Sequence, residues 1–115
     1  MNQDTLITPI PSQKEPPVPV VDKLKAERVE YQLSLTPGWH LAPDGAAIQR
    51  QFQFEQPGQA LAFAGLIYGL TARWQHRPEV RIAHANTVTC LLTSAEVGGL
   101  TARDFQVARR LSQQA

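Results

Sequence analysis

The stretch from Ile48 to Phe54 limits the fold most, because its side chains alternate in character. Ile48, Phe52 and Phe54 point to one side, with Arg50 interrupting them, and three glutamines point to the other: Gln49, Gln51 and Gln53. Successive side chains of a strand point to opposite faces of a sheet. This strand therefore has one buried and one wet face, which is typical of an antiparallel sheet covered on one side.

A helix is predicted from Pro57 to about Gln75. Proline suits the first turn of a helix, where its missing N–H leaves no hydrogen bond unmade. Apolar residues then recur at helical spacing and form one core-facing stripe: Phe63, Ile67, Leu70 and Trp74. Gly65 and Gly69 form a groove of small residues beside this stripe, which predicts close packing of another backbone against the helix.

A hairpin is predicted after this helix, with strands over residues 79–85 and 88–94 and a turn near Asn86. Pro78 ends the helix, because the residue before a proline is disfavoured in the α region. Alternate residues of the second strand face one side: Val88, Cys90 and Leu92.

A last helix is predicted to begin near Thr101, after Gly98 and Gly99 end the strand. Thr101 and Asp104 have the spacing of a capping box, in which the threonine hydroxyl serves the Asp104 N–H and the carboxylate reaches back to Thr101. The inward-facing residues of this helix are Phe105, Ala108 and Leu111.

The first half of the chain is predicted to hold a helix over residues 22–33, a short strand over 39–42 and a turn at 43–45. Residues 22–115 then form a single α+β domain, a four-stranded antiparallel sheet with two to three helices packed on one face. Residues 1–21 precede it as a Pro-rich tail, expected to be extended or disordered because proline fixes φ and removes a backbone donor. This tail either stays solvated or docks on a partner.

Composition excludes several classes of function. A formal charge of +1 argues against a nucleic-acid binder, and one cysteine rules out an intrachain disulfide and a multi-cysteine zinc site. No apolar run approaches the ~20 residues needed to cross a bilayer, and the N-terminus does not resemble a secretory signal. A cytoplasmic protein with no membrane contact, no metal and no cofactor is expected.

The chain resembles the pterin-4a-carbinolamine dehydratase family over most of the domain. The matching stretches are Gly38-Trp39, Gln51 to Phe54, the Phe63 helix, His76-x-Pro78-Glu79, Gly99 to Thr101 and Arg103-Asp104. The resemblance implies a four-stranded antiparallel sheet with helices on one face, assembled as a homodimer or tetramer.

The resemblance also implies where a catalytic site would lie. Family enzymes carry two adjacent histidines before the proline and a third at the end of the last strand, and these form the pocket that dehydrates a 4a-hydroxy pterin. Here the first position is His76, the second is Arg77, and the third falls on Ala95, or on Ser94 if the hairpin carries one extra residue. The acidic residue that often precedes the first histidine by one helical turn aligns with Ala72.

These replacements remove proton-transfer chemistry from the pocket. Losing hydroxide from C4a while removing a proton from N5 needs groups that give and take protons near neutral pH. Arg77 stays protonated, and Ala95 has no proton to give. His84 could substitute in principle, but strand alternation places it beside Val80 and Ile82, as a structural histidine. No catalytic residue is expected.

Two alternatives concern the basic end of the Pro57 helix. His76 is either part of a residual site or a helix C-terminal histidine whose charged form the helix dipole favours. Arg73, Arg77 and Arg81 form either a solvated basic edge or a patch that binds a partner.

Within the family, the degenerate site and the Pro-rich lead-in resemble one branch, the assembly factor (chaperone) for Rubisco of α-carboxysomes. This resemblance implies a non-enzymatic protein that binds Rubisco subunits in the cytoplasm or at carboxysomes during carbon fixation. The alternative is a 4a-hydroxytetrahydrobiopterin dehydratase, a lyase, with an altered active site. A third interpretation is a dimerisation or coactivator module.

Overall fold

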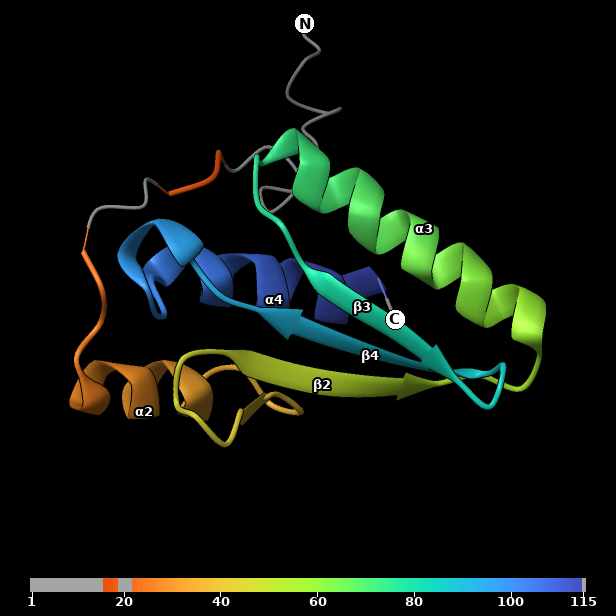
Figure 1. Ribbon diagram of the computed structural model, residues 1–115, viewed down its shortest axis with the longest axis horizontal. Helices are drawn as coiled ribbons and strands as arrows, with labels where there is room; N and C mark the ends of the chain where they lie inside the picture. Colours follow the sequence, from red (N-terminus) through yellow and green to blue (C-terminus); the bar gives the residue numbers. More distant parts are fainter. Residues whose placement is uncertain (1–15, 19–21, 115) are drawn as a thin grey trace, which may run out of the picture.

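The computed structural model describes residues 16–18 and 22–114 (Figure 1). Predictions for residues 1–15, 19–21 and 115 lie outside the described residues. The elements in chain order are α2 (Ala26–Ser34), β1 (His40–Leu41), β2 (Ile48–Gln53), α3 (Pro57–Arg73), β3 (Glu79–Ala83), β4 (Thr87–Leu92), a 3₁₀ turn (Ala95–Val97) and α4 (Ala102–Gln114).

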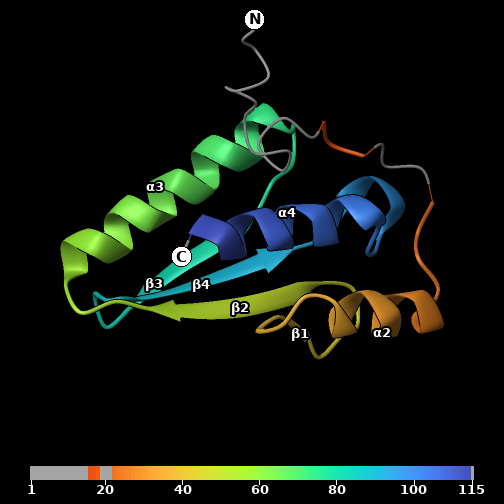
Figure 2. The ribbon, with the colours of Figure 1, turned by 180° about the vertical axis from the view of Figure 1, so that it is seen from behind.

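The four strands form one antiparallel sheet in the order β1-β2-β4-β3. Helix α4 lies behind the sheet in Figure 1 and in front of it in Figure 2, with α2 and α3 on either side. The predicted α+β fold, with its helices on one face of a four-stranded antiparallel sheet, is therefore confirmed.

The core lies between this sheet face and α4. Alternate residues of β2 and β4 are buried as predicted, and the α4 stripe packs on them: Ile48, Phe52, Val88, Cys90, Leu92, Phe105, Ala108 and Leu111. The rings of Phe52 and Phe63 lie 4.6 Å apart between centroids and join β2 to α3. Arg50, which interrupts the apolar side, lies over the Phe52 ring and donates to Ser112 Oγ of α4.

Helix α2 begins at Ala26, four residues later than predicted. The Leu24 N–H donates to the Leu100 carbonyl (2.8 Å), and Lys25 is extended with ψ 163°. A tertiary hydrogen bond therefore holds residues 24–25 out of the helix, although their side chains favour one. The strand predicted over residues 39–42 shortens to His40–Leu41, with Trp39 buried.

Two local predictions are wrong. His84 does not lie in β3 beside Val80 and Ile82, because the strand ends at Ala83 and His84 sits in the hairpin turn with φ 54°. Gly65 and Gly69 are not tightly packed, since no described atom lies within 4 Å of a Cβ built on either.

Candidate functional site

His76 is placed by the way α3 ends. Helix α3 stops at Arg73, with Trp74 as its C-cap. The two N–H groups after Trp74 close a Schellman motif: Gln75 donates to the Ala72 carbonyl (3.1 Å) and His76 to the Thr71 carbonyl (2.8 Å). Gln75 adopts the left-handed conformation (φ 54°) that this motif needs. The turn points the chain back, and the His76 side chain enters the protein with 2% of its surface exposed.

The His76 ring contacts a buried carboxylate, that of Asp104. His76 Nε2 lies 2.6 Å from Asp104 Oδ1, and Asp104 Oδ2 accepts hydrogen bonds from the Ser94 hydroxyl (2.8 Å) and the Thr101 N–H (2.9 Å). A carboxylate can only accept hydrogen bonds, so we assign the His76 tautomer in which Nε2 donates to Asp104. Ser94, Thr101 and Asp104 are each no more than 1% exposed.

The capping box is therefore half formed. The Asp104 carboxylate reaches back to the Thr101 N–H as predicted. The Thr101 hydroxyl instead pairs with the Ser94 hydroxyl (2.8 Å), and the Asp104 N–H donates to the Thr101 backbone carbonyl (3.1 Å). The cap has become part of a polar network that also holds His76.

The structure brings the positions implied by the resemblance together around His76. A pocket of about 330 Å³ is lined by Gln75, His76, Arg77, Thr93, Ala95 and Glu96. A second hollow, on the α3 side, shares three of these residues and adds Tyr68, Thr71 and Ala72. Arg77 and Ala95 therefore line one pocket together with His76.

His84 is not part of this pocket. His76 precedes β3 and His84 follows it, and the five residues of this strand span about 13 Å. The two histidines therefore lie at opposite ends of the strand. His76 is the pocket's only histidine.

The three predicted arginines are exposed but occupy different settings. Arg73 lines a hollow between α3 and α4, and Arg77 lines the His76 pocket. Arg81 forms an exposed ion pair with Glu79 of the same strand, which offsets its charge.

The sequence analysis did not predict the roles of two residues of the site. Ser94 supports the Asp104 carboxylate, and Glu96 contributes the pocket's carboxylate. The signal for Ser94 was available, because it continues the buried alternation of Val88, Cys90 and Leu92. No comparable pattern marks Glu96.

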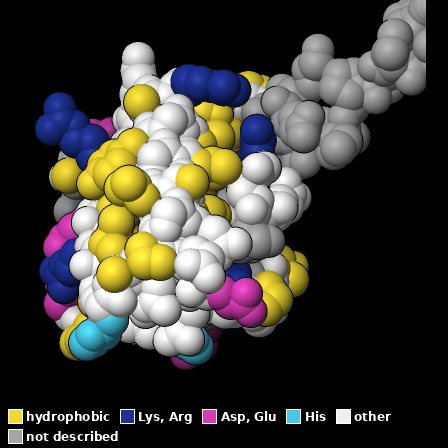
Figure 3. All heavy atoms as spheres, turned by 90° about the vertical axis from the view of Figure 1, so that its right-hand side faces the viewer, with side chains coloured by type: hydrophobic (Ala, Val, Ile, Leu, Met, Phe, Trp, Pro, Cys, Tyr) yellow, Lys and Arg dark blue, Asp and Glu magenta, His cyan; other side chains and the backbone are white. Residues whose placement is uncertain are grey.

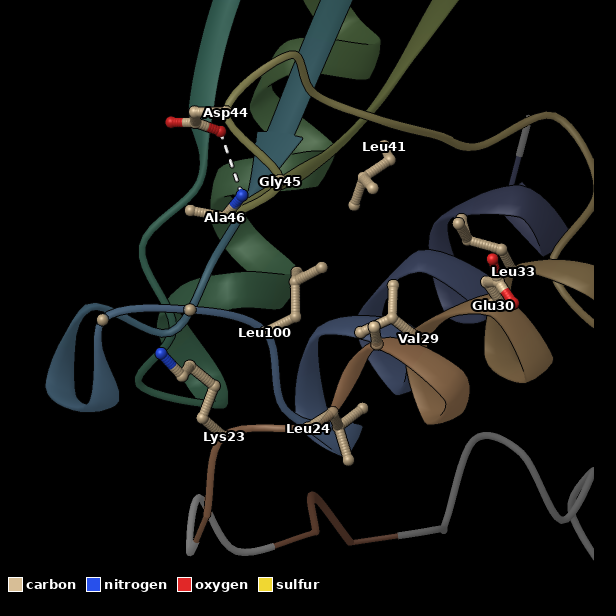
Figure 4. Close-up of a pocket in the computed structure, with 13 residues that line it drawn as sticks. Lys23, Leu24, Val29, Glu30, Leu33, Leu41, Asp44, Gly45, Ala46 and Leu100 are labelled. Atoms are coloured by element: carbon tan, nitrogen blue, oxygen red, sulfur yellow. Dashed lines mark hydrogen bonds between the residues drawn. The ribbon is translucent and has the colours of Figure 1, made fainter.

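A separate pocket of about 450 Å³ lies between α2, the β1–β2 turn and residues 98–100. In Figure 4, Val29, Leu41 and Leu100 line its interior, and Lys23 stands at its edge. It shares no lining residue with the His76 pocket.

Within the described part of the chain, no group of three or more His, Cys, Asp or Glu side chains could hold a metal ion. No helix among those residues is long and apolar enough to cross a membrane.

Comparisons with known proteins find similar sequences and a similar solved structure. The family model of pterin 4 alpha carbinolamine dehydratase matches residues 22–114. A protein of Xanthomonas campestris pv. campestris (strain B100), provisionally named a pterin-4-alpha-carbinolamine dehydratase, is 34% identical over 79% of this chain and 76% of its own length. A Sinorhizobium fredii protein with the same provisional name is 34% identical over 82% of this chain and 89% of its own.

Among solved structures, the crystal structure of a transcriptional coactivator/pterin dehydratase from Brucella melitensis superposes with a TM-score of 0.75. It is 25% identical in sequence, and the match covers 80% of this chain and 97% of that one.

Proposed function

We propose, from the premise that this chain belongs to the pterin 4 alpha carbinolamine dehydratase family, that it is a catalytically inactive member that acts as a Rubisco assembly factor associated with α-carboxysomes. One observation carries the inactive part of this proposal. The pocket holds a single imidazole, and that ring is buried with its Nε2 committed to Asp104.

The chemistry of dehydration explains why this matters. The reaction needs one group to protonate the leaving hydroxide and another to take the N5 proton, and each such group contributes about 10²–10⁴-fold in rate. Arg77 cannot act as a base, and Ala95 cannot act at all. His76 has only Nδ1 left, on a side chain that is 2% exposed.

The surface of the domain supports a role in binding another protein. Hydrophobic side chains gather in a band on the side of the molecule seen in Figure 3. Helix α3 exposes three large apolar side chains, Leu61, Leu66 and Tyr68, and carries no charged residue between Pro57 and Ala72. A contiguous exposed apolar surface is one mark of a site that binds another protein.

Arg73 is the last residue of the same helix and Arg77 follows four residues later, and both belong to the proposed contact surface. Charge at the rim of an apolar contact speeds association and selects the partner. Arg81 contributes less, because Glu79 pairs with it.

Co-expression with the large and small subunits of an α-carboxysomal Rubisco tests the assembly role. We expect a higher yield of assembled enzyme with the chain than without it, and loss of that gain in the Arg73→Glu/Arg77→Glu double variant. Arg28→Glu, an exposed arginine on α2, is the matched control and should keep the gain. An unchanged yield with the unmodified chain would contradict the proposal.

A second candidate is a dehydratase with an altered site. It is favoured by Glu96, which lines the same pocket as His76 and carries a carboxylate able to take a proton. Under this alternative the unmodified chain would dehydrate a 4a-hydroxytetrahydropterin and Glu96→Gln would abolish the activity.

A further inference from the structure

Residues Pro16–Val18 are held against α4 by side chains that bond their backbone. The Val18 N–H donates to Gln106 Oε1 (2.7 Å), and Gln106 Nε2 donates to the Pro16 carbonyl (2.9 Å). Arg103 Nε donates to the Val18 carbonyl (2.8 Å). The segment is the short red stretch that passes above α4 in Figure 1.

The geometry is that of peptide recognition. In an extended chain the carbonyl of one residue and the N–H two residues later point to the same side. A glutamine amide offers one acceptor and two donors in a plane, so Gln106 bonds both groups as a neighbouring strand would. Gln106 is 5% exposed, so this amide is a buried polar group whose bonds are made by the segment.

The sequence of the segment matches the site. Three of the four residues from Pro16 to Pro19 are prolines, so Val18 carries the only backbone N–H of the run, and Gln106 accepts it. No donor of this run is left to be buried without a partner. Proline also restricts the free chain to extended conformations, which lowers the entropy lost on docking.

Arg103 ties the site to the rest of the molecule. Its Nη1 donates to the carbonyl of Trp74 at the end of α3 (3.3 Å), while its Nε holds the segment. The bond to Trp74 does not involve the segment, so it can hold the Arg103 guanidinium in place when the segment leaves.

We propose that Gln106 and Arg103 form a binding site for an extended, proline-containing peptide, which Pro16–Val18 of the same chain occupies and which a like segment of another chain can enter in exchange. The recognised atoms are backbone atoms, so the site selects conformation and proline pattern rather than one side chain. Neither Gln106 nor Arg103 lines the His76 pocket, so this peptide site is separate from it.

Binding of Pro16–Val18 to its own chain is tested on the full-length protein by NMR measurement of amide hydrogen exchange at Val18. Replacing Gln106 with methionine, which has a similar shape but no amide, should speed exchange at Val18 on the order of 5–10-fold, because each lost hydrogen bond contributes about 1 kcal/mol. Gln113→Met, at an exposed position of the same helix, is the matched control and should leave the rate unchanged. Equal rates in the unmodified chain and Gln106→Met would overturn the proposal.

Exchange is tested with a fluorescent synthetic peptide of residues 12–22. In the unmodified chain the tethered segment competes with the peptide at roughly millimolar effective concentration. In the full-length Val18→Pro variant the chain's own segment loses its one N–H and competes less. The peptide should therefore bind this variant at least about 10-fold more tightly than it binds the unmodified chain. Adding Gln106→Met or Arg103→Gln to Val18→Pro should abolish binding, with circular dichroism confirming that each variant is folded. No binding to Val18→Pro, or equal binding to all three variants, would overturn the proposal.

Discussion

His76 Nε2 and Asp104 Oδ1 lie 2.6 Å apart, although 28 residues separate them in the chain. One residue follows the end of α3, and the other lies in the first turn of α4. The contact therefore joins two helices at the edge of the sheet and fixes the ring. The same contact removes one ring nitrogen from any chemistry in the pocket.

Asp104→Ala should lower the free energy of unfolding by about 3–4 kcal/mol, because it leaves three buried donors without their acceptor. Those donors are His76 Nε2, the Ser94 hydroxyl and the Thr101 N–H. Urea denaturation measures the change. Asp44→Ala is the control, since Asp44 is exposed and accepts one hydrogen bond, from the Ala46 N–H. Equal losses for the two variants would contradict the importance assigned to the network.

Cys90 should make stability fall at alkaline pH. Burial in β4 raises the pKa of its thiol from 9.0 to about 12. Between these values the unfolded chain has released the proton while the folded chain keeps it, so the free energy of unfolding falls by up to about 1.4 kcal/mol per pH unit as pH rises above 9.

The Cys90→Ala variant should be less stable than the unmodified chain at neutral pH, because the smaller side chain leaves a cavity. Since it lacks the thiol, its free energy of unfolding should fall less steeply between pH 9 and 11. Urea denaturation across that pH range measures both slopes. Identical slopes would mean that the thiol does not contribute.

Gly65→Ala and Gly69→Ala should each raise the free energy of unfolding by about 0.5–1 kcal/mol, the gain in helix propensity. No described atom lies within 4 Å of the added Cβ at either position. Gly38→Ala is the contrasting control and should destabilise, because Gly38 has φ 90° and an added Cβ would lie 3.0 Å from Arg50 Cζ. A loss of stability at position 65 or 69 would show that another chain packs closely there.

The sequence predicted the parts of the fold that depend on local periodicity. Alternation at Ile48–Gln53 and Thr87–Leu92 identified the buried face of the sheet, because period two fixes which side chains share a face. The start of α2 was missed, because the Leu24–Leu100 hydrogen bond overrides helix propensity and no local pattern encodes it.

The resemblance to the family, through Pro78 and Gly99 to Thr101, assigned His76, Arg77 and Ala95 to one site, and these three residues line one pocket. The sequence showed nothing of the pocket's geometry. The burial of His76 could not be foreseen, because the Schellman turn uses Gln75 in a left-handed conformation that usually favours glycine. The contact of Gln106 with Pro16 was equally hidden, since it joins residues 90 apart.

The rate at which the full-length chain dehydrates a 4a-hydroxytetrahydropterin decides whether the His76 pocket is catalytically inactive. With one buried imidazole beside Arg77 and Ala95, we expect a rate equal to that in buffer alone, and the same rate for a folded His76→Asn variant. An acceleration on the order of 10²-fold or more by the unmodified chain, lost in His76→Asn, would contradict this expectation.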